Sequence, residues 1–172
     1  AALGLWSDYA NNISMRNNIV HDNAKMGLEN EVAHAGEMIG NVSYRNKVGY
    51  MNYSSSNIVV KDNIFADNLV GVQYHFRRDR VPTLRPKQLL KKFKRYEASY
   101  FKAEIYDDFI HFLNHNFPCS KLSDNTTAGN VFINNGVDFL NAPPKQLPDP
   151  KESYLIAGNQ FKDNVIINTN PD

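Results

Sequence analysis

The chain has 172 residues, with 19 basic and 18 acidic side chains, a formal net charge of +1 and a mean hydropathy of −0.50. This length suffices for one domain with a buried core, and the near-neutral charge gives no overall signal for nucleic-acid binding. No apolar run is long enough to span a membrane, so no membrane partner is expected, and the single cysteine, Cys119, excludes an internal disulfide. The unusual feature is asparagine: 23 are present, and none lies between Asn68 and Asn114.

The asparagines recur as pairs whose members are five residues apart. The copies are NNIVHDN, GNVSYRN, DNIFADN, GNVFINN and a weaker GNQFKDN, at 17–23, 40–46, 62–68, 129–135 and 158–164. The first Asn of each copy recurs at intervals of 23, 22, 67 and 29. A glycine keeps the same period at Gly4, Gly27, Gly49 and Gly71, and Asp138 occupies the next slot. The interval of 67 is therefore interpreted as one repeat of 22 residues plus 45 inserted residues.

Each repeat predicts three short strands, at 5–8, 13–15 and 19–20 in the first copy, because apolar and polar residues alternate between Asn and Gly. The first and second strands are joined by predicted loops at 9–12, 32–35 and 54–57. A unit of this size cannot bury its apolar face alone, so successive units must stack as a solenoid, with equivalent residues about 4.8 Å apart. Stacked asparagine amides would then hydrogen-bond from one coil to the next, which explains the asparagine excess.

These copies, together with Gly-Leu-Trp-Ser-Asp at 4–8, resemble the right-handed parallel β-helix repeats of the pectin-lyase-like superfamily. That superfamily comprises polysaccharide lyases, glycoside hydrolases and uronan epimerases, and it also has non-catalytic members. The resemblance covers about 1–75 and 125–168. It implies an all-β fold, a right-handed parallel β-helix of about five coils, with a polysaccharide as partner and an extracellular or periplasmic location.

An insertion is predicted at 77–122, between coils at 1–76 and 123–172. Residues 77–102 hold ten Lys and Arg against two acidic residues, and 86–116 contain apolar residues at helical spacing with no internal glycine or proline. The insertion is therefore predicted to be α-helical, broken near Ala98. Three roles stay open: a basic lid that attracts anionic polysaccharide, a structural hairpin, or a protein- or nucleic-acid-binding appendage. Nucleic acid is the less favoured partner because the aromatic spacing fits a helix core.

The chain begins within the repeat register, which predicts that it forms the later coils of a longer β-helix. Alternatively, another copy covers the exposed edge, so that the chain self-associates through its terminal coils.

Two outward-facing columns carry the candidate chemistry. In the first strand of each repeat, the first and third residues after the glycine are predicted to point inward, which includes Asn30 and Asn52 and requires partners for them. The second and fourth point outward and form the columns Trp6, Glu29, Met51, Gln73 and Asp8, Glu31, Tyr53, His75.

The predicted function is cleavage or binding of an acidic polysaccharide on this outward face. Asp8 and Glu31, one coil apart, are the candidate carboxylate pair, His75 the candidate base and Arg77 the clamp for a uronate. The predicted substrate-binding residues are Trp6, Glu29, Tyr53, Gln73 and Arg78.

No motif fixes a reaction, so an enzyme of this kind would be a polysaccharide lyase or a glycoside hydrolase. No cofactor is required, although Asp8, Glu29 and Glu31 offer the oxygen ligands of a calcium site. His34 and Glu37 are expected to have local structural roles. The alternative is a non-catalytic structural or binding solenoid, such as a surface or tail protein.

Overall fold

The structure is a computed structural model that describes residues 1–8, 10–76, 122–142 and 157–169. The predicted helical insertion and its basic residues, Arg77 and Arg78 included, lie outside the described residues. Among those described, no helix is present that could cross a membrane.

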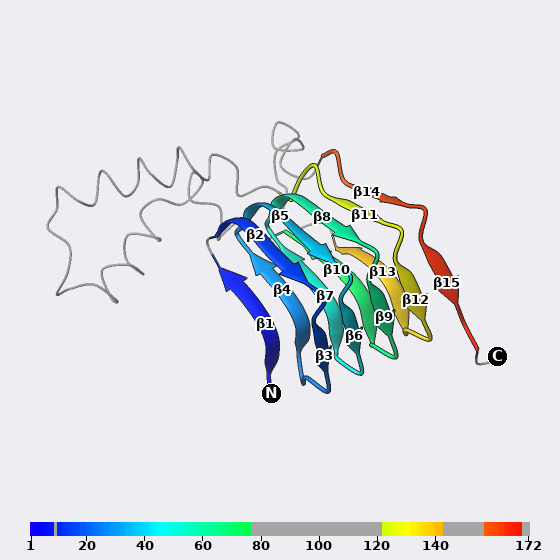
Figure 1. The fold of residues 1–172 in the computed structure, drawn as a ribbon. Helices are drawn as coiled ribbons and strands as arrows, with labels where there is room; N and C mark the ends of the chain where they lie inside the picture. The colour runs from blue at the N-terminus through cyan, green and yellow to red at the C-terminus, as the bar shows by residue number, and fades with distance from the viewer. Residues whose placement is uncertain (9, 77–121, 143–156, 170–172) are drawn as a thin grey trace, which may run out of the picture.

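In the described residues, fifteen parallel strands form three five-stranded sheets, and the chain visits the sheets in turn, one strand per sheet in each coil (Figure 1). Sheet A contains β1 (Leu3–Asp8), β4 (Met26–Glu31), β7 (Val48–Tyr53), β10 (Val70–His75) and β13 (Val137–Ala142). Sheet B contains β2 (Asn11–Arg16), β5 (His34–Ile39), β8 (Ser56–Lys61), β11 (Thr126–Ala128) and β14 (Gln160–Lys162). Sheet C contains β3 (Ile19–His21), β6 (Val42–Tyr44), β9 (Ile64–Ala66), β12 (Val131–Ile133) and β15 (Val165–Ile167).

This arrangement confirms the predicted parallel β-helix of five coils. The connections between sheets A and B are shorter than predicted, because β5 and β8 begin at His34 and Ser56. The predicted interval of 67 is confirmed, since Thr126 pairs with Val59 across the insertion. The insertion therefore interrupts the chain without interrupting the stack of coils.

Asparagine ladders join the coils at two corners of the triangular cross-section. At the corner between sheets B and C, the backbone N–H and the side-chain Nδ2 of one Asn both donate to Oδ1 of the Asn in the next coil, at 2.8–3.0 Å. The members of this first ladder are Asn18, Asn41, Asn63, Asn130 and Asn164. The second ladder, between sheets C and A, has the same bonds at 2.9–3.2 Å through Asn23, Asn46, Asn68 and Asn135.

A residue with positive φ precedes each rung of the first ladder and turns the chain through the corner. It is always Asn, Asp or Gly, the residue types that tolerate the left-handed region, with φ of 54–66°: Asn17, Gly40, Asp62, Gly129 and Asp163. The dipeptides Asn-Asn, Gly-Asn and Asp-Asn of the repeat are thus a corner residue followed by a ladder residue.

The predicted alignment of the last copy is wrong. It placed Asn159 in the column of Asn130, 29 residues on, whereas Asn164 stacks on Asn130 and Asn159 stacks on Asn125, both 34 residues on. Asn125 is a third corner asparagine, five residues before Asn130. Because successive corner positions are five residues apart, a pair of asparagines with that spacing fits either of two pairs of corners.

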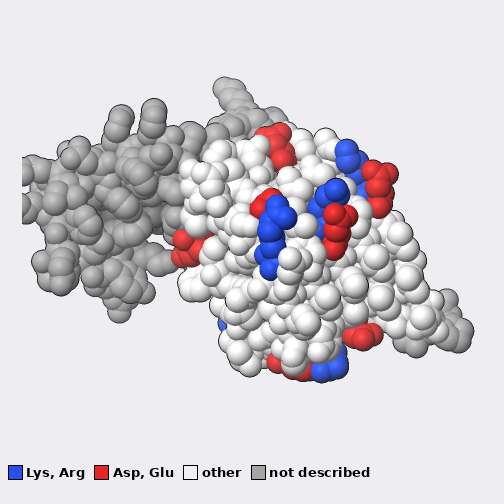
Figure 2. All heavy atoms as spheres, in the orientation of Figure 1, with Lys and Arg blue, Asp and Glu red and all other residues white. Residues whose placement is uncertain are grey.

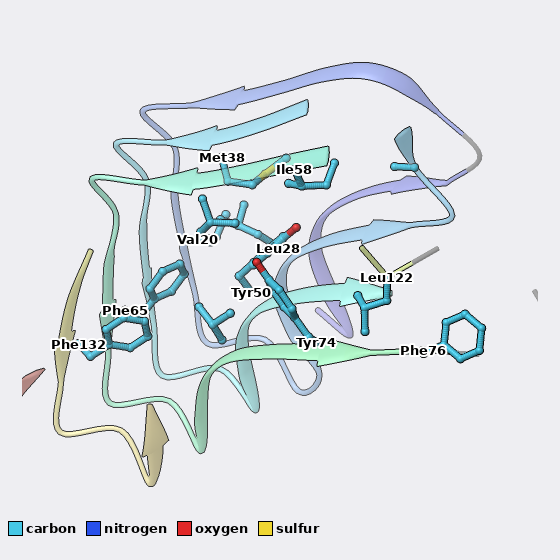
Figure 3. Close-up of a cluster of buried hydrophobic side chains, with 13 residues drawn as sticks. Val20, Leu28, Met38, Tyr50, Ile58, Phe65, Tyr74, Phe76, Leu122 and Phe132 are labelled. Atoms are coloured by element: carbon cyan, nitrogen blue, oxygen red, sulfur yellow. The ribbon is translucent and has the colours of Figure 1, made fainter. Parts of the chain in front are cut away.

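The core is a column of apolar side chains inside the coils. Figure 3 shows Phe65 and Phe132 of neighbouring coils side by side, and Met38 and Ile58 opposite the tyrosines of sheet A. The rings of Phe65 and Phe132 are tilted by 30° to each other, and their centroids are 5.4 Å apart. The inward positions predicted in coils 2–4 of sheet A are confirmed, since all are fully buried: Leu28, Asn30, Tyr50, Asn52, Val72 and Tyr74. Phe76 and Leu122, on either side of the insertion, both belong to this core.

The ladder leads to a stability prediction at Asn63, which is 1 % exposed. Its Oδ1 accepts two bonds from Asn41, and its Nδ2 donates to the backbone oxygen of Met38 and to Oδ1 of Asn130. Replacing Asn63 with Ala leaves these buried groups without partners, so the free energy of unfolding should fall by about 2–4 kcal/mol. Chemical denaturation measures this change.

The matched control is Asn11→Ala, at an exposed position of β2. It should change the unfolding free energy by less than about 0.5 kcal/mol. Equal effects of the two substitutions would show that the ladder does not contribute the stability assigned to it.

Candidate functional site

The outward face of sheet A is built as two columns, and the register places every described candidate as predicted. Trp6 pairs with Glu29, Glu29 with Met51 and Met51 with Gln73. In the second column, Asp8 pairs with Glu31, Glu31 with Tyr53 and Tyr53 with His75. Eight candidate positions from four coils therefore lie in two adjacent rows, because parallel strands in register stack equivalent residues.

Burial on this face differs between coils. Trp6 in the first coil is 51 % exposed, and Asp8 beside it is exposed as well. In the next two coils Glu29, Glu31 and Met51 are 4, 9 and 7 % exposed, although they point away from the coil interior. Asp8, Glu29, Glu31, Tyr53 and His75 all have interaction partners. The outward face of sheet A is therefore exposed to solvent at the first coil and largely buried at the next two coils.

A small apolar cluster adjoins the carboxylates. Val48, Met51 and Val70 are buried together, and Met26 and Tyr53 pack against them. Glu31 pairs with Tyr53 in the neighbouring strand, so a carboxylate lies at the border of this cluster.

His75 contacts an aromatic ring and lies away from the carboxylate pair. Its ring stacks on Tyr53, with centroids 4.9 Å apart and planes inclined by 23°. Tyr53 stands between His75 and Glu31 in the column, so His75 and Glu31 are two strands, or about 10 Å, apart along the sheet. His75 and the pair of Asp8 and Glu31 would therefore act on different parts of an extended ligand.

The two inward-pointing asparagines of sheet A, Asn30 and Asn52, have hydrogen-bond partners for most of their polar atoms. Asn30 accepts a hydrogen bond from Ser7 Oγ at 3.0 Å and donates to the Tyr50 hydroxyl at 3.4 Å. Asn52 Oδ1 accepts the Ser55 N–H at 3.1 Å, while its Nδ2 has no partner among the described residues. Burial raises the pKa of the Tyr50 hydroxyl, which is neutral in the core.

The calcium expectation has no support in the described part of the chain, where no group of three or more His, Cys, Asp or Glu side chains is placed to hold a metal ion. Glu29 and Glu31 belong to separate columns two residues apart on one strand, which spreads the three carboxylates along the sheet. His34 and Glu37 take local contacts: His34 Nδ1 lies 3.0 Å from Ser56 Oγ, and Glu37 binds Arg16 and Ser14.

An exposed ionic cluster between the first two coils was missed from the sequence. Asp22 accepts two hydrogen bonds from Arg45, at 2.7 and 2.6 Å, and lies 2.6 Å from His21 Nδ1. The His21 ring stacks on Tyr44, and the Arg45 guanidinium lies 4.6 Å from the centre of the Tyr44 ring. The interval of 23 between Asp22 and Arg45 puts both in one corner column, which is the signal that could have revealed the pair.

Basic side chains elsewhere on the visible face are also paired with acidic ones. Figure 2 shows basic side chains lying next to acidic ones over the described coils, with no large patch of one sign. Arg16 with Glu37 and Lys61 with Asp62 are two further pairs. The visible face of these coils therefore carries no broad patch of a single charge sign.

The Asp22 cluster predicts a pH-dependent contribution to stability. Hydrogen bonds from Arg45, and secondarily from His21, hold the pKa of the Asp22 carboxyl well below its ordinary value. Its contribution is therefore complete above the ordinary aspartate pKa of about 3.9 and is lost as the pH falls below it. Asp22→Asn should lower the melting temperature slightly at neutral pH and low salt, and the difference from wild type should disappear in acid or in high salt.

Asp163→Asn is the matched control, because Asp163 is also exposed at a corner with positive φ. It should leave the pH dependence of the melting temperature unchanged. A difference between wild type and Asp22→Asn that grows in acid would contradict the assignment.

The family described as right-handed β-helix region matches residues 1–83. No curated protein and no solved structure matches the chain. The matched stretch holds the first three coils and the start of the fourth, and β11–β15 extend the same sheets beyond it. The parallel strands in three sheets and the family match agree on a right-handed parallel β-helix fold.

Proposed function

We propose that the outward face of sheet A binds an acidic polysaccharide and that Asp8 and Glu31 form the carboxylate pair that cleaves it. The observation that carries this proposal is the direct pairing of Asp8 with Glu31 in neighbouring parallel strands. Neighbouring strands are about 4.8 Å apart, close to the separation of about 5–5.5 Å between the two carboxyl groups of retaining glycosidases.

The two carboxylates of the pair have unequal surroundings. Asp8 is exposed on the first coil, whereas Glu31 is 9 % exposed and lies at the border of the cluster around Met51. Carboxyl groups in unlike environments can divide the roles of acid and base or nucleophile. In this scheme the bond to be cleaved lies over the first two coils.

Aromatic and amide groups would position the sugar rings. Trp6, which is half exposed, presents an indole beside the pair, and Tyr53 and Gln73 continue the face along the following coils. The preference for an acidic polymer comes from the sequence, where Arg77 begins a basic stretch over 77–102, two residues after His75. A uronate carboxylate would pair with such guanidinium groups. An extracellular or periplasmic location accompanies a polysaccharide substrate.

A non-catalytic solenoid is the second candidate, and burial favours it. Glu29 and Met51, in the middle of the face, are 4 and 7 % exposed, which leaves little surface there for a sugar. In this alternative the face is a packing surface, and the protein is a structural or binding element.

A panel of uronans tests the proposal. The wild-type chain should bind at least one of them and release reducing ends or unsaturated uronates, the latter detected by ultraviolet absorbance. Asp8→Asn and Glu31→Gln should each lower kcat by about 10²–10⁴-fold, because each removes a group that transfers a proton or attacks the sugar. Binding of the intact polymer should change much less.

Glu37→Gln is the matched control, since Glu37 lies on the outward face of sheet B and should not affect turnover. Binding without cleavage, unchanged by Glu31→Gln, would support the non-catalytic solenoid. A chain that binds no uronan, with intact fold by circular dichroism, would overturn the proposal for this face.

A further inference from the structure

One asparagine of the second ladder is followed by glycine. Among the 23 asparagines of the sequence, only Asn135 precedes a glycine, Gly136. The other three members of this ladder precede residues that carry a Cβ atom: Asn23, Asn46 and Asn68 are followed by Ala24, Lys47 and Leu69. Because glycine has no side chain and the widest range of backbone conformations, its nitrogen can approach the side chain of the preceding asparagine with little hindrance.

The reaction that this pair permits is loss of the side-chain amide. The backbone nitrogen of Gly136 forms a bond to Cγ of Asn135, and the bond between Cγ and Nδ2 breaks. Nδ2 leaves as ammonia and takes up the proton that the Gly136 nitrogen gives up, which leaves a cyclic imide. Water then adds to one of the two carbonyl carbons of the imide and opens the ring, so that aspartate or isoaspartate takes the place of the asparagine.

The folded structure holds both reacting groups in other contacts. Oδ1 of Asn135 accepts the backbone N–H and Nδ2 of Asn68, at 3.0 and 3.1 Å. Its Nδ2 donates to the backbone oxygen of Phe65 at 2.9 Å and to Oδ1 of Asp138 at 3.2 Å. The N–H of Gly136 donates to the backbone oxygen of Asn68 at 2.9 Å. The attack requires the asparagine side chain to turn away from these partners, so the ladder protects it while the fourth coil stays stacked on the third.

The products would not restore these contacts. A carboxylate has no hydrogen to donate, so the backbone oxygen of Phe65 would lose its donor, and the new charge would lie beside the carboxylate of Asp138. Isoaspartate also adds one carbon atom to the backbone, directly before β13, whose pairing with β10 begins at Val137. Either product therefore weakens the joint between the third and fourth coils.

We propose that Asn135 is a deamidation site that is protected in the folded chain and becomes reactive when the fourth coil opens. Opening by itself is reversible, because the ladder can form again. Deamidation during opening removes a ladder residue permanently, so this pair limits how long an opened chain can still refold. The site lies at the corner between sheets C and A, and the proposal does not depend on the function proposed for the outward face of sheet A.

Peptide mass spectrometry of the full chain tests the site. The chain is held at one mildly alkaline pH and one temperature, with and without guanidinium chloride, and aspartate and isoaspartate are quantified at each asparagine over time. In denaturant, Asn135 should react at least about tenfold faster than its three ladder counterparts, because each of these precedes a residue with a Cβ atom. Without denaturant, the rate at Asn135 should be at least about tenfold lower, because only opened molecules react.

Gly136→Ala is the matched variant, and it is compared in denaturant. The added Cβ should slow the reaction at Asn135 by at least about tenfold and leave the rates at the three ladder counterparts unchanged. The unfolded chain is the right state for this comparison, because in the folded chain a Cβ at Gly136 would meet the backbone oxygen of Leu69 at 2.8 Å.

Refolding tests the consequence of the reaction. Samples are taken from denaturant at intervals, diluted into buffer and treated briefly with a protease, so that folded molecules survive. Molecules modified at Asn135 should be depleted among the survivors. As a second measurement, Asn135→Asp should unfold at a lower denaturant concentration than Asn11→Asp, which introduces the same charge at an exposed position.

Three results would overturn the proposal: a rate at Asn135 in denaturant no higher than at its ladder counterparts, an equal rate in the folded chain, or modified molecules that refold as completely as unmodified ones. Equal stability of Asn135→Asp and Asn11→Asp would contradict the assigned consequence in the same way.

Discussion

The fold depends on the hydrogen bonding of buried corner groups from one coil to the next. A coil of this β-helix bends at three corners, and at each bend the backbone N–H and C=O groups turn away from the regular sheet pairing. The asparagines supply an N–H, a carbonyl oxygen and an amide in one residue, so a single column satisfies the groups of both neighbouring coils. Asn41, Asn63 and Asn130 do this while essentially fully buried. At the two ladder corners, the loss of such a residue would leave unpaired polar groups beside the core, which costs more than the hydrogen bonds gain.

Much of this architecture can be predicted from the sequence, because residues that are one repeat apart in the sequence lie one above the other in neighbouring coils. The recurrence of Gly4, Gly27, Gly49 and Gly71 locates sheet A, and Asp138 in the next slot lies opposite Gly71, as predicted. The fifth coil was misaligned for a physical reason. Three corner positions five residues apart accept asparagine, and the fourth coil uses all three, so Asn159 and Asn164 fit two alignments equally well. The strand pairing decides between them, since Thr126 pairs with Gln160 and Val131 with Val165.

The candidate site shows a second limit. Alternation along a strand gives the direction of a side chain, so the columns of Trp6 and Asp8 were predicted correctly. It gives no information about what lies beyond the sheet, and the burial of Glu29 and Glu31 could not be foreseen. The cluster around Asp22 was missed because its parts are dispersed in the sequence and meet only when Arg45 is stacked one coil on. The repeat period therefore predicts which residues stack on one another, whereas the burial and contacts of each side chain require the three-dimensional structure.

The corners also differ in how much chain they can accommodate. Both long departures from the basic period, the one after Phe76 and the shorter one after Ala142, lie between a strand of sheet A and a strand of sheet B. The corner between sheets B and C has two residues in every described coil, and the corner between sheets C and A varies only by the one extra residue that the first coil has between His21 and Met26. The junction between sheets A and B is therefore the position at which this scaffold accepts foreign sequence. A loop grafted there would emerge next to the column of Asp8, Glu31, Tyr53 and His75, so that a new binding specificity could be introduced at the edge of that face without disturbing the framework beneath it.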